Sequence, residues 1–332
     1  MLKLRPFHDD DFEAFHAIVS DYEVVKMLGS WPFPAETEFT HMRMNTPEAK
    51  AGQVLVIEVD GKLAGTIGGM SRGIGYMLGR KFWGRGVGTW AVREMVQRMF
   101  EDSDIGEVTA SAWQDNAASA RVLEKCGFRP TGAGEFYGKA RGETLEYNDF
   151  SLSRAAWARG QPLALQVERL VIAPFLGNEA AALSALMNDP DIARMMATIP
   201  HPFTEVDAQK WLDERVFSHV IGDENGFCAK VSLHNGTLIG FVGIGGAPVN
   251  TAYAFGRAYW GQGFATEAMQ AFLAHCERVF ALKEITAGAM FDNLASQTVL
   301  GKLGFEKVGE KQHKASGRSE PECLWLYSLK AR

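Results

Sequence analysis

The chain has 332 residues, which is long enough for two domains of ordinary size. Apolar residues make up 46% and charged residues 22%, as in a typical globular protein, and the formal charge of −6 argues against broad binding to nucleic acid. Four cysteines stand far apart, which excludes a zinc cluster and a disulfide scaffold. The charged N-terminal residues lack the apolar core of a signal peptide, and the longest apolar stretch, 238–249, is too short to span a membrane. We therefore expect a cytoplasmic protein with reduced cysteines and no metal site.

An internal repeat is the most informative feature of the sequence. Residues 76–89 recur as residues 253–266, and the same offset of 177 residues continues without a gap through the segments that follow. Of the 47 positions from Phe82 to Phe128, 18 are identical to their partners in the second copy. A solenoid repeats every ~20–50 residues, so this much longer period indicates one domain fold used twice.

The junction between the copies falls at 154–166, where Ala, Gly, Pro and Gln replace patterned sequence. We predict an N-terminal domain at 1–158 and a C-terminal domain at 163–332. The first residues of the two copies align more loosely, with Pro6 opposite Pro174, which indicates small insertions in the second copy.

In chain order, each copy is predicted to form a strand, short helices, a strand hairpin, a glycine-rich loop that opens a helix, a strand, a helix and final strands. The hairpin of the first copy turns at Asp60-Gly61, and that of the second copy turns at Asn235-Gly236. After each glycine-rich loop, apolar residues recur at helical spacing and predict a buried helix face. These residues are Val92, Met95, Val96 and Met99 in the first copy, and Met269, Phe272, Leu273 and Cys276 in the second.

The glycine-rich loops, residues 83–89 and 260–266, have the features of an anion site. Glycine permits close approach of the backbone, and the start of the following helix offers unpaired N–H groups and a partial positive charge. The flanking cations are Arg80, Lys81 and Arg85 in the first copy and Arg257 in the second, where Gln262 replaces Arg85. Together these features favour binding of a pyrophosphate group.

A glycine-rich loop can also be a P-loop, a dinucleotide-binding loop or a turn without a ligand. No Gly-Lys-Ser/Thr is present, which excludes a P-loop, and the glycine spacing and the missing acidic ribose-binding residue argue against a dinucleotide fold. A turn without a ligand would explain either loop alone, but the same downstream elements follow both loops. In those elements, Asn116 and Gly127 are suitable residues for capping a helix, and by themselves they predict no more than that.

The combination of W-G-x-G-x-G/A-T with a downstream N-x-x-S-x-x-x-L-x-K-x-G-F resembles the GNAT family of acetyl-CoA-dependent N-acetyltransferases. The W-G-Q-G-F-A-T-E-A of residues 260–268 is similar to the Rim-type branch, which includes ribosomal-protein N-terminal acetyltransferases. The resemblance covers nearly the whole chain, as a tandem pair. It implies an α+β fold of two tandem GNAT domains, each with a mixed, mainly antiparallel sheet flanked by helices. It also implies acetyl-CoA as the cosubstrate and no metal.

The resemblance further implies where the coenzyme binds. Backbone N–H groups of the loops would hold the pyrophosphate, an asparagine would contact the pantetheine arm, and a backbone N–H of the preceding strand would polarise the acetyl carbonyl. The residues concerned are Met77, Arg80, Arg85, Gly86, Val87, Gly88, Thr89 and Asn116 in the first copy, and Ala254, Arg257, Gln262, Gly263, Phe264, Ala265, Thr266 and Asn293 in the second.

Three residues are candidate catalytic groups. Many family members carry a Tyr general acid seven residues after the asparagine, where both copies here have leucine. Ser119 and Ser296 are then the nearest proton donors, although each also fits an ordinary residue of a first helical turn. Glu146 stands where Rim-type relatives have an acidic residue on a late strand and is the candidate base, and an exposed strand carboxylate is an equal interpretation. Cys323 occupies that position in the second copy.

We therefore expect at least one domain to transfer an acetyl group from acetyl-CoA to a primary amine by direct attack in a ternary complex. The acceptor stays open, because a peptide N-terminus, an amino acid, a polyamine and an aminoglycoside all fit the fold. The alternative is a sensor or scaffold that binds acyl-CoA with one or both domains catalytically silent. No nucleic-acid or membrane partner is expected, and the sequence does not assign an oligomeric state.

Overall fold

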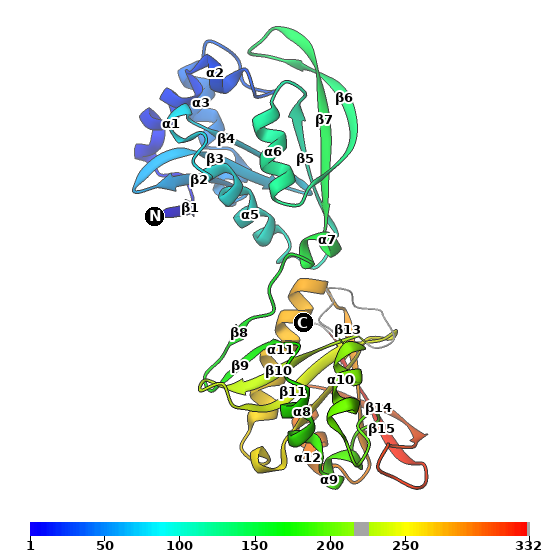
Figure 1. Cartoon of the computed structure of the whole chain (residues 1–332). Coiled ribbons are helices and arrows are strands. Elements are labelled where there is room, and N and C mark those ends of the chain that lie inside the picture. The colour runs from blue at the N-terminus through cyan, green and yellow to red at the C-terminus, as the bar shows by residue number, and fades with distance from the viewer. Residues whose placement is uncertain (216–225, 331–332) are drawn as a thin grey trace. The chain divides into compact units, whose positions relative to one another are not determined.

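The computed structural model describes residues 1–215 and 226–330, and the chain forms two units, Met1–Trp157 and Ala158–Arg332 (Figure 1). Each unit contains one mixed sheet flanked by helices, so the expected α+β class with mainly antiparallel sheets is confirmed. Within the described residues, none of the helices has the length and apolarity needed to cross a lipid bilayer. Among the residues that the structure describes, no group of three or more His, Cys, Asp or Glu is placed to hold a metal ion.

The first unit is built on a seven-stranded sheet with the order β1-β2-β3-β4-β5-β7-β6. Its strands are β1 (Leu2–Arg5), β2 (Val54–Val59), β3 (Lys62–Met70), β4 (Gly73–Leu78), β5 (Glu107–Trp113), β6 (Arg129–Gly138) and β7 (Glu143–Ser153). Its helices are η1 (Asp9–Asp11), α1 (Phe12–Val19), α2 (Tyr22–Val25), α3 (Thr37–Met44), α4 (Pro47–Lys50), η2 (Arg80–Phe82), α5 (Val87–Met99), α6 (Ala117–Lys125) and α7 (Arg154–Ala158). Only the neighbours β4 and β5 run parallel among the described strands of this sheet.

The second unit has an eight-stranded sheet with the order β14-β15-β13-β12-β11-β10-β9-β8. Its strands are β8 (Leu165–Gln166), β9 (Leu170–Pro174), β10 (Phe227–Leu233), β11 (Leu238–Gly245), β12 (Asn250–Phe255), β13 (Glu284–Met290), β14 (Glu306–His313) and β15 (Glu322–Lys330). Its helices are α8 (Ala180–Met187), α9 (Pro190–Ala193), α10 (Glu205–Asp213), η3 (Arg257–Tyr259), α11 (Phe264–Phe280) and α12 (Leu294–Lys302). The parallel pair here is β12 with β13.

Apolar side chains on both faces of each sheet build two cores. In the second unit, Phe227 on β10 packs with Phe272 of α11, whereas the next residue, Cys228, packs on the opposite face with Leu183 of α8. This alternation follows from the two-residue period of a strand. In the first unit, Val56 of β2 joins Phe15 of α1 in a comparable cluster. The apolar stripes predicted for α5 and α11 are buried, as the helical spacing indicated.

The sequence repeat corresponds to a repeat of structure. Strand β4, helix α5, strand β5 and helix α6 have their counterparts in β12, α11, β13 and α12, each starting 177 residues later. Helix α11 is longer than α5 at its C-terminal end, so the copies differ where α11 leads back to the sheet. The two units therefore share the part of the fold that carries the glycine-rich loop.

In each unit the two parallel strands separate soon after they begin. Strands β4 and β5 are paired only at Gly73 with Thr109, and β12 and β13 are paired only at 250–251 with 286–287. Beyond these points, residues from both strands of each pair line a cleft. Strands that separate leave backbone N–H and C=O groups without sheet partners on their facing edges. Each cleft therefore offers backbone donors and acceptors to a ligand.

Candidate active site

The glycine-rich loops place two unusual backbone conformations before each long helix. Gly84 and Gly86 have φ values of 70° and 78°, and Gly261 and Gly263 repeat them at 75° and 81°. Gly86 and Gly263 are the N-cap residues of α5 and α11, and neither helix receives a hydrogen bond from a capping side chain. A Cβ atom at Gly86 would meet no atom within 4 Å. Each helix start thus presents free N–H groups toward open space, which fits a pyrophosphate group.

A tryptophan fixes each loop to the strand before it. The indole N–H of Trp83 donates to the carbonyl of Leu78 over 2.7 Å, and that of Trp260 donates to the carbonyl of Phe255 over 2.7 Å. Each bond spans five residues and closes the loop at the end of β4 or β12. This bond gives a physical reason for Trp before the glycines in both copies.

The cations predicted beside the loops are partly engaged elsewhere. Arg80 donates to the carboxylate of Asp21 over 2.5 Å, and Arg257 forms an ion pair with Asp191. Neither Arg80 nor Arg257 lines the cleft of its unit, and the same holds for Arg85. These guanidinium groups therefore stand outside the clefts, and their predicted contact with the coenzyme stays a prediction.

Arg169 supplies a cation at the second loop that sequence reasoning missed. Its Nη1 donates to the carbonyl of Gln262 over 3.0 Å, and its Nε donates to the carboxylate of Glu267 over 2.7 Å. A Cβ atom at Gly263 would lie 3.5 Å from Nη2 of Arg169. Gln262 replaces the arginine of the first copy, so Arg169 restores positive charge to the second loop. It stands 93 residues before Gln262, and no motif pointed to it.

The clefts have volumes of about 720 Å³ in the first unit and about 1200 Å³ in the second. Most of the predicted coenzyme residues line them. In the first unit these are Met77, Gly86, Val87, Gly88, Thr89 and Asn116, and in the second Ala254, Gly263, Phe264, Ala265, Thr266 and Asn293. Ser119 and Ser296 also line the clefts. The glycine-rich loop, the separated strands and the start of the following helix thus meet in one place in each unit.

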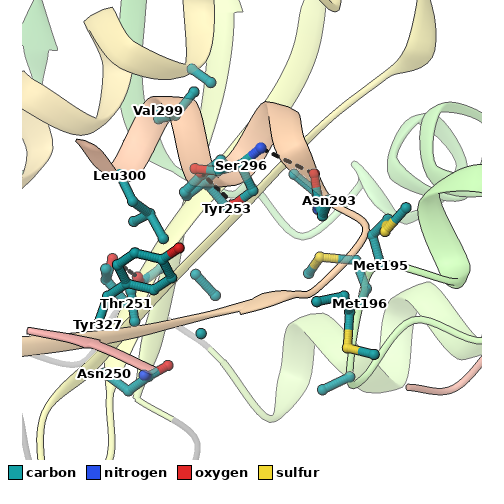
Figure 2. Close-up of a pocket in the computed structure, with 18 of the residues that line it drawn as sticks. Met195, Met196, Asn250, Thr251, Tyr253, Asn293, Ser296, Val299, Leu300 and Tyr327 are labelled. Carbon is teal, nitrogen blue, oxygen red and sulfur yellow. Dashed lines mark hydrogen bonds between the residues drawn. The ribbon is translucent and has the colours of Figure 1, made fainter. Parts of the chain in front are cut away.

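A Tyr–Ser pair stands in each cleft. In the first unit the Tyr76 hydroxyl lies 2.9 Å from the Ser119 Oγ, and Asn116 Oδ1 accepts a hydrogen bond from the Ser119 N–H over 3.1 Å. Figure 2 shows the corresponding arrangement in the second unit, where the Tyr253 hydroxyl lies 2.8 Å from the Ser296 Oγ. The asparagine caps its helix and orients the serine toward a strand residue 43 positions away. The serine thus connects the first turn of its helix to the strand, and its catalytic role stays a prediction.

Burial determines the protonation of both tyrosines. Removal from water raises the pKa of Tyr76 to about 12, against a smaller opposing effect of the hydrogen bond to Ser119. It likewise raises the pKa of Tyr253 to about 12. Each phenol is protonated at neutral pH, as an ordinary tyrosine is, and the raised pKa makes it a hydrogen-bond donor that holds its proton more firmly. Sequence reasoning missed these tyrosines, because they lie on the strand before the loop and not after the asparagine.

Glu146 lies on β7, opposite Glu135 of β6, and is exposed. The next residue, Tyr147, lines the cleft. Neighbouring residues of a strand point to opposite faces, so the carboxylate of Glu146 and the ring of Tyr147 project to different sides. In the second unit Cys323 stands at the position of Glu146 and is half-buried.

An arginine clamp closes one end of each cleft. Arg141, in the turn between β6 and β7, donates to both carboxylate oxygens of Asp115 over 2.6 and 3.1 Å and to the carbonyl of Lys26 over 2.7 Å. Arg318 forms the equivalent bonds with Asp292 and with the carbonyl of Arg194 in the second unit. The hydrogen bond from Arg141 holds the pKa of Asp115 below its ordinary value. Each clamp joins the hairpin, the residue before the asparagine and the segment after α2 or α9.

Comparison with known families identifies this arrangement. A family model of the acetyltransferase (GNAT) domain matches residues 1–129 and 169–306. The chain belongs to the GNAT acetyltransferase family. It is an acetyl-CoA-dependent acetyltransferase, as its motifs predicted, and the two matched segments fall one in each unit.

Individual GNAT relatives are distant. The chain is 28% identical over 171 residues to the uncharacterized N-acetyltransferase p20 of Bacillus licheniformis, covering 47% of this chain and 95% of that protein. It is 26% identical over 166 residues to the FsC-acetyl coenzyme A-N(2)-transacetylase of Aspergillus fumigatus, covering 47% of this chain and 64% of that protein. Similar solved structures include the Rim-type ribosomal-protein-S5-alanine acetyltransferase from Vibrio fischeri, with 20% identity and a TM-score of 0.42 over 50% of this chain and 96% of that one.

Proposed function

We propose that each GNAT domain of this chain binds acetyl-CoA in its own cleft and transfers the acetyl group to a primary amine by direct attack in a ternary complex. The observation that carries the proposal is the repetition of three features in both units. These are a glycine-rich loop at a helix start without a capping side chain, a pair of separated strands, and a buried Tyr–Ser pair.

The glycine-rich loops are the proposed pyrophosphate sites. Backbone N–H groups at 86–89 and 263–266 point from a helix start into open space, and the helix dipole favours negative charge there. Glycine at the N-cap leaves the approach free of side-chain atoms at Gly86, whereas at Gly263 the Arg169 guanidinium lies beside it. Arg85 in the first domain and Arg169 in the second would add long-range attraction. Asn116 and Asn293 would then meet the pantetheine arm.

Acetyl-CoA supplies an activated acyl group, and its departing thiolate needs a proton or a hydrogen bond. A thiol with an ordinary pKa of ~8.5 is a poor leaving group as a bare anion, so a nearby acid lowers the barrier. We assign to Ser119 a hydrogen bond donated to the departing sulfur, strengthened by the Tyr76 hydroxyl that lies 2.9 Å from the Ser119 Oγ, while the proton that the amine loses passes to the thiolate through water. Ser296 and Tyr253 would act in the same way in the second domain. The buried phenol keeps its proton at neutral pH, so the pair is supplied with a donor.

The acceptor amine must lose a proton before it attacks. Alkyl amines are mostly protonated at neutral pH, so a base or a water chain has to receive that proton. We retain Glu146 as the candidate base of the first domain only through a chain of water molecules, because its exposed carboxylate projects to the side of the sheet opposite to the cleft residue Tyr147. The second domain has Cys323 there and would release the proton to water directly. A peptide N-terminus or a small-molecule amine remains the proposed acceptor.

Calorimetric titration of the full chain with acetyl-CoA tests the proposal, followed by release of free thiol in the presence of amines. Two binding sites per chain, with thiol release that depends on the amine, are expected. Binding without amine-dependent release from either domain would instead favour an acyl-CoA sensor or scaffold. Absence of binding would refute the assignment of the clefts.

A further inference from the structure

The face of the sheet beside each Tyr–Ser pair differs between the two domains. In the first domain, Trp113 of β5 lies opposite Tyr147 of β7, and Ser111 lies opposite Asp149. The same register positions in the second domain hold Met290 opposite Leu324 and Gly288 opposite Leu326. These pairs belong to the strands that frame the clefts, and most of their members line them. Aromatic and polar residues therefore stand in one domain where aliphatic residues stand in the other.

Three aromatic rings gather at the cleft of the first domain. The ring centroid of Trp113 lies 6.3 Å from that of Tyr147, at an interplanar angle of 68°, and 6.4 Å from that of Phe136. Phe136 is 53% exposed, although it is a large apolar residue. A Cβ atom at Gly134 would lie 2.6 Å from the hydroxyl of Tyr147, so the glycine leaves the room that this ring occupies. The Phe136 ring packs beside Trp113 and against Gly29, and the rest of it is exposed at the cleft.

A carboxylate accompanies these rings. The Ser111 hydroxyl, which lines the cleft, donates to Asp149 over 2.6 Å. Asp149 shares a strand face with Tyr147, because the two are separated by two positions on β7. A carboxylate held by a hydroxyl beside aromatic rings attracts an ammonium group, and the rings favour a flat hydrophobic substituent. The rings and Ser111 line the cleft, whereas Asp149 stands behind Ser111 and would act on the ammonium group through its charge.

The second domain replaces each of these features. Leu324 packs over Gly288, where an added Cβ would lie 3.1 Å from it, and Leu326 stands in place of Asp149. Lys311 and His313 line this cleft at the positions that Gly134 and Phe136 occupy in the first domain. The Met195 and Met196 side chains border the same cleft (Figure 2). This surface is aliphatic with positive charge at its edge, and it lacks the aromatic rings and the carboxylate of the first domain.

We infer that the two domains acetylate different acceptors, and that the acceptor of the N-terminal domain carries an aromatic ring next to its primary amine. The inference rests on the proposed function and adds the chemical class of the acceptor. Asp149 attracts the ammonium form, and Trp113, Phe136 and Tyr147 receive the ring. The C-terminal domain accepts amines on aliphatic groups instead.

Phenethylamine and isoamylamine are suitable probes, because they are simple amines with a ring and an aliphatic end group respectively. Thiol release would be measured for the full chain and for Asp149→Asn, Tyr147→Leu and Glu107→Gln. Asp149→Asn keeps the side-chain size, and Tyr147→Leu introduces the residue of the second domain. Glu107→Gln is the matched control, since it removes an exposed carboxylate from the far end of β5.

We expect Asp149→Asn and Tyr147→Leu each to lower kcat/KM for phenethylamine at least tenfold. The value for isoamylamine and the KM for acetyl-CoA should change less than twofold, and Glu107→Gln should behave as the unmodified chain. Saturation-transfer NMR with coenzyme A should show contacts to the ring protons of phenethylamine that disappear in Tyr147→Leu. Equal losses for both amines, or none for phenethylamine, would overturn the inference and leave the proposed function standing. Failure to bind acetyl-CoA would overturn both.

Discussion

Replacement of Gly86 by aspartate should weaken coenzyme binding by the N-terminal domain much more than replacement by asparagine. Both side chains tolerate the left-handed conformation better than other residues, and Gly86 has a φ of 78°. Both also project into space where a Cβ meets no atom within 4 Å. The two variants therefore carry nearly the same backbone cost, and they differ by one negative charge.

The expected difference follows from Coulomb's law. A carboxylate ~4 Å from a phosphate oxygen is repelled by about 1 kcal/mol in bulk water and by about 4 kcal/mol at the effective dielectric of a protein surface. The helix start before Val87 is exposed on one side and bounded by protein on the other, so a value of about 2 kcal/mol is reasonable. This corresponds to roughly thirtyfold weaker binding for Gly86→Asp than for Gly86→Asn.

The second domain provides an internal comparison. A Cβ at Gly263 lies 3.5 Å from the Arg169 Nη2, so a new carboxylate there would find a guanidinium partner. The difference between Gly263→Asp and Gly263→Asn should therefore be smaller than that at Gly86. The ratio of the two penalties measures how far Arg169 offsets the added charge.

Calorimetric titration of each full-length variant with acetyl-CoA would give the affinity and number of sites, and urea denaturation would check that each Asp and Asn pair is equally stable. Raising the ionic strength to about 1 M, where the Debye length is ~3 Å, should reduce the difference between the variants. Equal affinity of Gly86→Asp and Gly86→Asn at low salt would refute the placement of the pyrophosphate at this helix start.

Three further predictions concern residues outside the glycine-rich loops. Tyr76→Phe should lower kcat about tenfold. This is less than the ~10²-fold typical of a lost general acid, because Ser119 keeps its hydroxyl. A change in the KM for acetyl-CoA with kcat unchanged would contradict this role. Arg169→Gln should weaken coenzyme binding by the C-terminal domain about tenfold and leave the N-terminal site unchanged, because Glu267 then stands unpaired near the loop. Calorimetric titration would detect the difference in affinity between the two sites. Arg141→Met should lower the free energy of unfolding by about 2 kcal/mol in urea, since it removes the bond to the Lys26 carbonyl and a largely exposed ion pair with Asp115. The pKa of Asp115 is lowered in the fold, so its share of this stability is present above the unfolded pKa of ~3.9 and is lost as the pH falls through the folded value. The difference in the free energy of unfolding between Arg141→Met and the unmodified chain should therefore become smaller in acid. A difference that does not change with pH would show that the ion pair contributes nothing.

The sequence repeat predicted most of the coenzyme part of the site because that part is local. Loop, helix, strand and capped helix follow one another within about fifty residues, and each has its own composition signal. The local roles of Gly86 and Asn116 could be predicted from the residues themselves, because a positive φ and an N-cap restrict the residue type, whereas their contact with the coenzyme was implied by the resemblance and stays a prediction. The two-domain arrangement followed from the offset between the copies.

Contacts between distant segments could not be predicted in the same way. Tyr76 meets Ser119 across 43 residues, and Arg169 meets Gln262 across 93, so neither pair forms a motif. The side on which a strand residue projects was equally inaccessible. A shift of one residue moves a side chain to the other face, and β6 pairs with β7 through an irregularity between Pro130 and Gly132. Glu146 was therefore the candidate from sequence, whereas its neighbour Tyr147 lines the cleft.

The two copies act as controls for each other, because they share one fold in one chain. Identical residues concentrate where the pyrophosphate and the pantetheine would lie, as at Gly86 with Gly263 and Asn116 with Asn293. On the strand face beside the Tyr–Ser pair, the two domains have no residue in common at the four register positions. Trp113, Tyr147, Ser111 and Asp149 of the first domain correspond to Met290, Leu324, Gly288 and Leu326 of the second. If both domains served one acceptor, these positions of the second domain should resemble those of the first domain in their chemistry. The coenzyme part also diverges, as at Arg85 with Gln262 and Gly88 with Ala265, but there the backbone features are kept, whereas the acceptor side changes its chemistry at every position. This contrast supports the inference of one coenzyme chemistry applied to two acceptors.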